Sequence, residues 1–302
     1  MNIAGALAKQ NLNVLVIDID PQGNASTALG IDHYSDVTSI YDVLIDDVPM
    51  RDAVAQAPDF ETLVCVPATI DLAGAEIELV SLVVGDGADL AFVSLQLWDD
   101  GSQHLGQHDA IVGKDAKLKH IVVTLGGDVV RLNANVRYSA TGGEAELLGL
   151  YFSDAGQHLE HRTYIDHNTA KATSNVMYKG ALQGKDARSV WIGDVLIRPE
   201  ALGIDTYELN RNLILTDGAR ADSVPNLEIE TGDIEGAGHA SSTGRFDEEH
   251  LFYLMSRGIP EDVARQLVVR GFFNEVIQKI QVPEIEDVLS ARIEDELARS
   301  VL

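Results

Sequence analysis

The sequence has 302 residues, 45% of them hydrophobic, which is enough to bury the core of one large or two modest domains. Its net charge of −26, from 48 acidic and 22 basic residues, disfavours binding to nucleic acid or to an anionic membrane. No transmembrane run or signal peptide is predicted, so we expect a cytoplasmic protein, and the single cysteine, Cys65, excludes an intrachain disulfide.

The first predicted elements are a short amphipathic helix over residues 3–10 and a strand over residues 14–17. The strand is a continuous run of apolar residues, which predicts a parallel strand covered on both faces. It ends at the sequence DIDPQGN, residues 18–24. Carboxylates at the carboxyl end of such a strand are where α/β folds place metal and phosphate chemistry.

Further motifs follow in residues 29–30, 39–44 and 66–76, and together residues 2–82 resemble the ParA family of partitioning ATPases. The resemblance implies that Asp20 lies near the attacking water and Asp18 near magnesium. The family's phosphate loop should lie just before Asn2, and no GxxxxGK[ST] motif occurs in the sequence. Phosphoryl transfer depends almost entirely on positioning and charge stabilisation, so we expect a degenerate, inactive nucleotide site.

From residue 83 onward, short β-rich runs alternate with turns that carry Gly and an acidic residue, followed by Ala. The turn recurs at residues 85–90, 113–118, 142–147 and 184–189, with an irregular copy at 168–171. Repeats of this kind predict stacked coils, that is, a mainly β solenoid. A β-sandwich is the alternative, although most runs lack the tight Asn-Gly or Asp-Gly hairpin between them.

After residue 244 the pattern becomes helical. Residues 247–257 predict a helix with Asp247 as N-cap, and Gly258 suits its end. A second helix over residues 261–270 should bury Val263, Leu267 and Val268. A third helix over residues 272–280 and an acidic helix after residue 283 complete the prediction.

Several stretches keep a family's order and spacing: residues 142–152, 157–162, 166–167, 174–180, 225–229, 238–241 and 252–259. On these stretches residues 83–302 resemble SufD-type subunits of the SUF iron–sulfur cluster assembly scaffold. The resemblance implies a right-handed parallel β-helix followed by a helical domain. It also implies two partners, a SufB-like subunit and a SufC-like ATPase, the ATPase docking on helices that carry Phe252, Leu254, Arg257 and Gly258. The expected domains are residues 1–82, 83–245 and 246–302.

Other histidines are weaker candidates for metal ligands. His104 and His108 have the spacing of a metal site if they lie on a helix, but no helix is predicted there. In a strand, His158 and Glu160 would face one way and His161 the other, and we expect these residues to form polar surface.

His239 is the strongest candidate ligand. It lies in the small-residue sequence GAGHASS, residues 236–242, where another backbone or a cluster can approach closely. Neutral imidazole is a competent iron ligand. The resemblance implies that His239 acts in cluster assembly at the interface with the SufB-like subunit; the alternative is a histidine that only forms hydrogen bonds at a domain junction.

Cluster binding by this chain alone is not expected. Many members of the family that it resembles carry a cysteine where this sequence has Ala237, and no cysteine follows Cys65. Iron–sulfur clusters are held mainly by thiolates, so any cluster would be transient and mostly held by a partner.

Three hypotheses follow. The leading one is a non-catalytic scaffold component of iron–sulfur cluster assembly, with no cofactor bound by the chain alone. The second is a ParA-type partitioning ATPase remnant, which the missing phosphate loop and the acidic charge oppose. The third is a non-functional chimeric fragment joined near residues 81–83.

Overall fold

The computed structural model describes residues 2–11, 13–18, 22–34, 37–45, 48–69, 75–99, 101–246, 248–280, 289 and 291–293. The chain divides into two compact units, Met1–Ile77 and Glu78–Leu302. The division therefore falls earlier than the expected boundary at residue 82.

The first unit is a small α/β fold. Its elements are α1 (Asn2–Ala8), β1 (Val14–Ile17), α2 (Asn24–Ala28), α3 (Ile40–Ile45), the 3₁₀ helix η1 (Met50–Asp52), β2 (Ala55–Gln56) and β3 (Leu63–Val66). The strands form one sheet in the order β1-β3-β2, with β1 parallel and β2 antiparallel to β3. The expectation that β1 is covered on both faces is wrong, because its side chains alternate and Leu15 and Ile17 are exposed. Strand β1 is also an edge strand, which leaves one side of its backbone unpaired within the described sheet.

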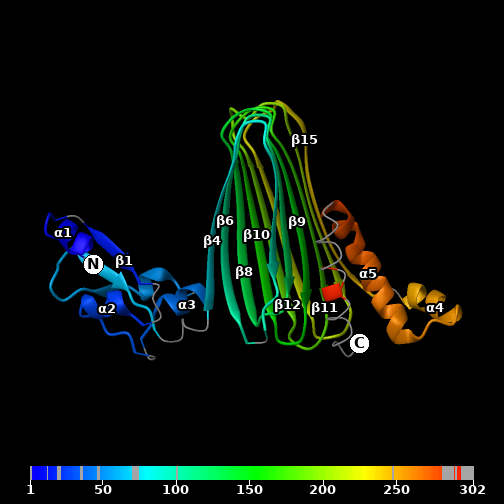
Figure 1. The fold of residues 1–302 in the computed structure, drawn as a ribbon, viewed down its shortest axis with the longest axis horizontal. Coiled ribbons are helices and arrows are strands. Elements are labelled where there is room, and N and C mark those ends of the chain that lie inside the picture. The colour runs from blue at the N-terminus through cyan, green and yellow to red at the C-terminus, as the bar shows by residue number, and fades with distance from the viewer. Residues whose placement is uncertain are drawn as a thin grey trace. The chain divides into compact units, whose positions relative to one another are not determined.

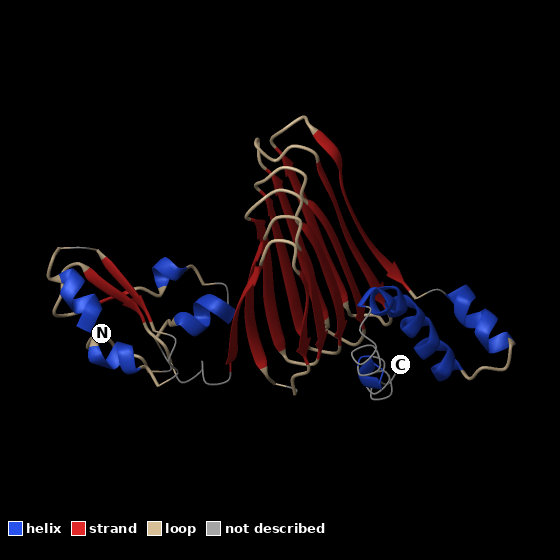
Figure 2. Ribbon diagram, turned by 45° about the horizontal axis from the view of Figure 1, so that its top comes forward, coloured by secondary structure: helices blue, strands red, loops and turns tan. Residues whose placement is uncertain are grey.

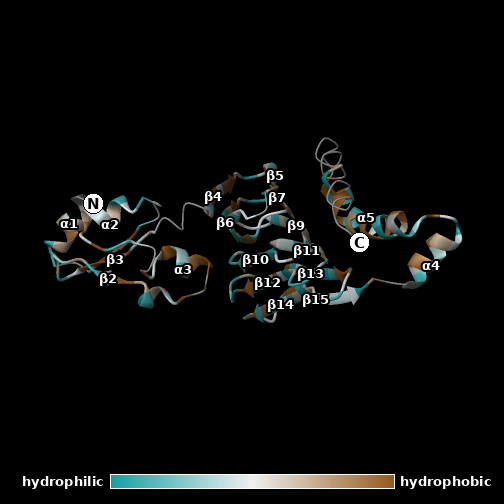
Figure 3. Cartoon of the chain, turned by 90° about the horizontal axis from the view of Figure 1, so that it is seen from below, coloured by the Kyte–Doolittle hydropathy of each residue, from teal (hydrophilic) through white to brown (hydrophobic). Residues whose placement is uncertain are grey.

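The second unit contains the predicted solenoid, built from two parallel six-stranded sheets. The first sheet is made of β4 (Ala75–Val84), β6 (Gln103–Val112), β8 (Val129–Tyr138), β10 (His158–His167), β12 (Arg188–Ile197) and β14 (Arg220–Ile229). The second sheet is made of β5 (Asp89–Gln96), β7 (Lys117–Leu125), β9 (Glu144–Ser153), β11 (Thr173–Leu182), β13 (Ile204–Ile214) and β15 (Ile234–Arg245). Consecutive strands alternate between the sheets, so each turn of the chain adds one strand to both (Figures 1 and 3).

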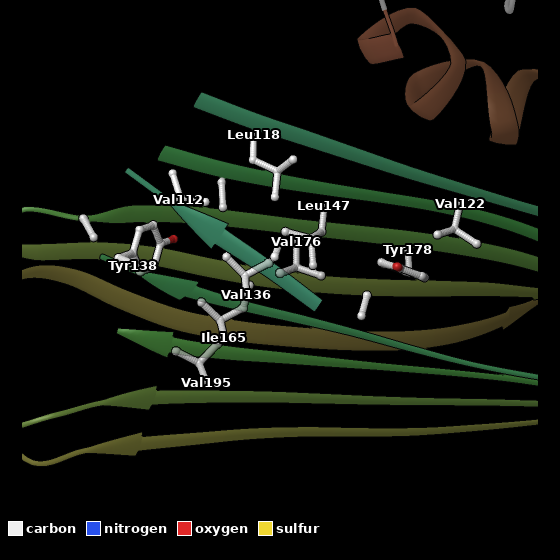
Figure 4. Close-up of a cluster of buried hydrophobic side chains, with 14 of the residues drawn as sticks. Val112, Leu118, Val122, Val136, Tyr138, Leu147, Ile165, Val176, Tyr178 and Val195 are labelled. Atoms are coloured by element: carbon white, nitrogen blue, oxygen red, sulfur yellow. The ribbon is translucent and has the colours of Figure 1, made fainter. Parts of the chain in front are cut away.

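In-register pairing produces the solenoid core. Val136, Ile165 and Val195 are register neighbours on β8, β10 and β12, and all three are buried. Side chains alternate between the two faces of a strand, so one face of every strand points between the sheets. Figure 4 shows these residues meeting others from the second sheet, among them Leu147 and Val176. Each such buried side chain contributes about 1.5–3 kcal/mol.

The recurring turns stack at one end of the solenoid, as the adjacent loops in Figure 2 show. Five of them place a residue at positive φ: Gly87, Asp115, Gly142, Lys171 and Gly203. Backbone hydrogen bonds link successive turns, for example from Gly87 N to Lys114 O at 2.8 Å. The copy predicted at residues 184–189 does not belong to this series. It lies between β11 and β12, at the opposite end, although Asp186 has a positive φ as Asp115 does.

The helical part differs from the prediction. It contains α4 (Glu248–Ser256) and α5 (Glu261–Ile280), and α5 is one continuous helix that passes through Gly271 instead of two. Val263 and Leu267 are exposed, contrary to expectation. Gly258 follows α4 at positive φ, as a helix C-terminus favours. Asp247 and the acidic helix expected after residue 283 fall largely outside the described residues.

Helix α5 covers the outer face of the second sheet. It packs against β9 and β11, and Figure 3 shows it beside that column of strands. The outer faces of β7, β9 and β11 are apolar and are buried against the helices. The residues that meet there include Ile121, Leu148, Leu150 and Met177 from the sheet and Ala264, Val269, Phe273, Val276 and Ile280 from α5. The face of α5 that is buried is the one that packs against the apolar outer face of the second sheet. Helical periodicity alone does not reveal which face that is. No helix in the described part of the chain has the length and apolarity needed to cross a membrane.

Candidate functional site

The last turn of the solenoid forms an open end. Strands β14 and β15 are terminal in their sheets and pair with only one described neighbour each, β12 and β13. Strand β15 carries His239, which is exposed. Ala237, two residues earlier on the same strand face, packs against the core between the sheets. His239 therefore lies on the inward face of the solenoid, at the end where no further described strand covers the interior.

The register places a buried carboxyl group next to this histidine. Glu208 of β13 pairs directly with His239 of β15. Its side chain is 1% exposed, and neither carboxylate oxygen has a hydrogen-bond partner among the described residues. Burial disfavours the charged form and the nearby Asp194 adds repulsion, so the pKa of Glu208 is raised to about 8. Across from it, Gly193 leaves the room that Glu208 uses, since a Cβ there would lie 2.8 Å from Oε1.

A buried hydrogen-bond network runs beside Glu208. The Tyr151 hydroxyl donates to Asn212 Oδ1 at 2.6 Å, and Asn212 Nδ2 donates to Asn210 Oδ1 at 2.7 Å. The network reaches the last turn at Ser223 of β14, whose hydroxyl donates to Asn210 Oδ1 at 2.6 Å. Because the buried side-chain amides form hydrogen bonds with one another, they hold β13 and β14 of the last turns in place against Tyr151 in the interior.

His104 and His108 lie on strand β6 and not on a helix, and both side chains point into the solenoid. Their Nε2 atoms lie 3.3 and 3.2 Å from Oε2 of Glu78 on β4. His108 Nδ1 is 2.9 Å from Nε2 of His120. Burial lowers the pKa of His120 to about 3. Sequence reasoning missed this cluster because it assigned Glu78 to the first domain; the nearly continuous apolar run over residues 77–84, typical of a strand, was the available signal. Within the described residues, no group of three or more His, Cys, Asp or Glu side chains could hold a metal ion.

The prediction of polar surface at residues 157–162 is wrong for three of its polar residues, because Gln157, Glu160 and His161 are buried. His161 is buried inside the solenoid, where its Nε2 lies 2.8 Å from the Thr124 hydroxyl. Glu160 faces outward but is covered by arginine side chains, with Arg131 Nε 3.2 Å from Oε1. Burial alone would raise the pKa of Glu160, but the His158 hydrogen bond and the two neighbouring cations, Arg131 and Arg162, lower it to about 2.

The residues predicted to dock an ATPase lie on and after α4. Phe252 is 73% exposed, Arg257 and Gly258 are exposed, and Leu254 is partly buried against the helical core. Arg257 lies over the ring of Tyr253, 5.0 Å from its centroid. This arrangement leaves an exposed aromatic group on a short helix and an exposed cationic group directly after it.

In the first unit, Asp18 is buried at the end of β1. Its Oδ2 accepts hydrogen bonds from the backbone N and the hydroxyl of Ser26, at 2.7 and 2.6 Å. Asp20, the other predicted residue of a nucleotide site, lies outside the described residues.

The fold is thus a two-sheet parallel β-solenoid with a histidine at its open end, followed by helices that cover one sheet. Over residues 62–272 the sequence matches the family described as "SUF system FeS cluster assembly, SufBD core domain". The chain belongs to this family. Residues 1–87 match the family described as "AAA domain".

Curated relatives agree with this assignment. The chain is 63% identical over 224 residues to an iron–sulfur cluster assembly SufBD family protein of Mycobacterium tuberculosis, covering 72% of this chain and 56% of the relative. It is 27% identical over 210 residues to the iron–sulfur cluster assembly protein SufD of Escherichia coli, covering 70% and 49%. For SufD of Bacillus subtilis the identity is 28% over 230 residues, covering 75% and 52%. The chain spans about half the length of the curated relatives that it matches.

Proposed function

We propose that this chain is a non-catalytic scaffold subunit for iron–sulfur cluster assembly that works with a SufB-like subunit and a SufC-like ATPase. Family membership and the names of its relatives support the process. The observation that carries the proposal is the open end of the solenoid, where two unpaired strand edges and an exposed histidine coincide.

The SufB-like subunit would add strands to β14 and β15. Free strand edges present unpaired N–H and C=O groups and readily accept another chain. Val224 and Ile229 of β14 are 44% and 43% exposed, so apolar surface accompanies the free edge. A second solenoid seated there would cover both edges and the open interior at once.

His239 would contribute one ligand to a cluster assembled at that interface. The cluster is the cargo of the reaction, and this chain supplies no thiolate for it, because Cys65 is buried in the first unit. Most ligands would come from the partner. Replacing His239 with Ala should leave the complex intact and abolish cluster formation in it.

The SufC-like ATPase would dock on α4 and the start of the loop after it. Phe252 is the proposed anchor, because a large aromatic side chain that is mostly exposed has apolar area to bury on binding. Arg257 lies one turn further along and would add a charged contact.

Co-expression with both partners and size-exclusion chromatography test this proposal. We expect a stable ternary complex from the wild-type chain, loss of the SufB-like subunit from Ile229→Arg, and loss of the SufC-like ATPase from Phe252→Asp. Leu202→Asp, at a comparably exposed apolar residue in the loop between β12 and β13, is the matched control and should retain both. A folded wild-type chain that elutes alone would contradict the proposal and support a chimeric fragment without function.

For the first unit we propose a degenerate nucleotide site without ATPase activity. Asp18, which the family resemblance places near magnesium, has its Oδ2 engaged by two donors from Ser26. Titration of the full chain with Mg²⁺ and ATP should show no saturable binding. Micromolar affinity would revive the partitioning ATPase as the function of this unit.

A further inference from the structure

We propose that Glu208 is the second protein ligand at the open end of the solenoid, and that Glu208 and His239 together bind one divalent transition-metal ion such as Fe²⁺. The inference deepens the proposed function and rests on it for the role of His239 in cluster assembly. It adds a residue that no motif in the sequence indicated.

Geometry permits the two side chains to share one ion. Glu208 and His239 are direct register partners on adjacent parallel strands, so their backbones lie about 4.8 Å apart and their side chains leave the sheet on the same face. A carboxylate and an imidazole can both reach an ion about 2.1 Å away from that spacing. No other residue pair of β13 and β15 combines two metal-ligating side chains on the inward face.

The surroundings of Glu208 lack a partner that would explain its burial. Both carboxylate oxygens lie without a hydrogen bond among the described residues. The nearest groups on the opposite strand are Gly193 and the ring of Trp191, which carry no charge, and the charge of that strand that acts on Glu208 is the like charge of Asp194. Burying a carboxyl group without a hydrogen-bond partner costs folding free energy. Natural proteins retain such a group where a proton or a cation neutralises its charge.

Access comes from the open end. His239 is exposed, while Glu208 lies one strand deeper and is 1% exposed. An ion that enters past the last turn would meet the imidazole first and the carboxylate behind it. Two ligands leave most positions of a metal ion open to water, and a partner subunit seated on β14 and β15 would be placed to supply the rest.

The register column explains why this pair occurs only at the last turn. Inward residues on successive strands of the second sheet are Phe92, His120, Leu147, Val176, Glu208 and His239. Leu147 and Val176 separate Glu208 from the buried His120, so an ion held at the open end has no continuous path of ligands inward along this column. The geometry assigns a terminal site and not a channel.

Binding of Co²⁺ to the full chain, without partners, tests the inference by calorimetry and visible absorption. Co²⁺ accepts the same N and O ligands as Fe²⁺ and does not oxidise during the titration. We expect one site, with Glu208→Gln and His239→Ala each weakening the affinity by about tenfold or more. Glu208→Asp, which keeps the carboxylate, should recover part of the loss.

Two controls match the variants in chemistry. Glu235→Gln removes an exposed carboxylate from the same strand as His239, and His158→Ala removes a histidine from the outer face of β10. Both should leave the affinity within about twofold of wild type. Circular dichroism establishes that each variant is folded.

Wild-type affinity in Glu208→Gln, or the absence of a Co²⁺ site in the wild-type chain, would overturn the inference. Either result leaves the proposed function intact if the ternary complex still forms. Conversely, a Co²⁺ site that depends on both residues in a chain that binds no partner would refute the scaffold role and retain the metal site.

Discussion

Glu208→Gln gives the sharpest test of the energetics at the open end. Burial raises the pKa of Glu208 from 4.5 to about 8, so between these values the folded chain holds a proton that the unfolded chain has lost. Because the folded state binds more protons than the unfolded state in this range, the free energy of unfolding falls as pH rises from about 4.5 to 8. The slope from one group is at most about 1.4 kcal/mol per pH unit, which gives a cost of roughly 1–3 kcal/mol at pH 7 after allowance for relaxation.

Glutamine does not titrate, so the stability of the Glu208→Gln variant should increase relative to that of wild type as pH rises. Buried histidines act in the opposite direction in both proteins: burial lowers the pKa of His120 to about 3 and of His161 and His167 to about 4. Their contribution cancels in the difference between variant and wild type.

Urea unfolding at pH values of about 5.5, 6.5 and 7.5, monitored by tryptophan fluorescence, measures the difference in free energy of unfolding between the variant and wild type. Both tryptophans, Trp98 and Trp191, lie in the second unit, so the signal reports the solenoid and not the first unit. Glu235→Gln is the control for removing an acidic side chain. A free-energy difference between Glu208→Gln and wild type that stays constant with pH would refute the assignment of Glu208 as a buried, uncompensated acid.

Three further predictions concern the solenoid. Ile165→Ala should lower the free energy of unfolding by about 2–5 kcal/mol, because Ile165 is fully buried between register neighbours; urea denaturation measures this loss. The pKa of Glu160, lowered to about 2, contributes stability that is present above about 4.5 and lost as pH falls toward 2, so Glu160→Gln should flatten the acid limb of a thermal-unfolding series. Tyr151→Phe leaves Asn212 without its buried donor and should cost about 1–3 kcal/mol, and an unchanged melting temperature would show that the network adapts.

The solenoid could be predicted because its turns repeat in composition and its strands repeat in length. Gly87, Asp115 and Gly142 supply the same backbone conformation at the same place in successive turns, and such local features are legible in a sequence. The turn at residue 184 shows the limit, since the same composition serves the opposite end. Turn chemistry specifies a bend but not which bend of the coil it is.

Of the two residues of the proposed site, only His239 is recognisable in the sequence, from its small neighbours. Glu208 is not, because its importance in the proposal arises from its pairing with a residue on another strand. The same holds for Glu78, which meets His104 and His108 only once β4 is placed beside β6. The buried face of α5 likewise depends on the sheet beneath it, and the helix alone offers several apolar stripes.

A parallel solenoid has two ends by construction, and each inward column must stop at both. Along the interior, every inward residue is covered by its register neighbours, so polar groups there need partners within the column or across it. At β15 no further described strand supplies that cover on one side, where His239 is exposed and Glu208 lies one strand behind it. A partner that covers β14 and β15 would therefore pair the backbone edges of both strands and could also supply a partner for the carboxyl group of Glu208. A partner that supplied only strands would do the first of these, and a metal ion alone would do the second. The coincidence of both at one end of the coil is why we propose that cluster assembly takes place there and not at the outer face of either sheet.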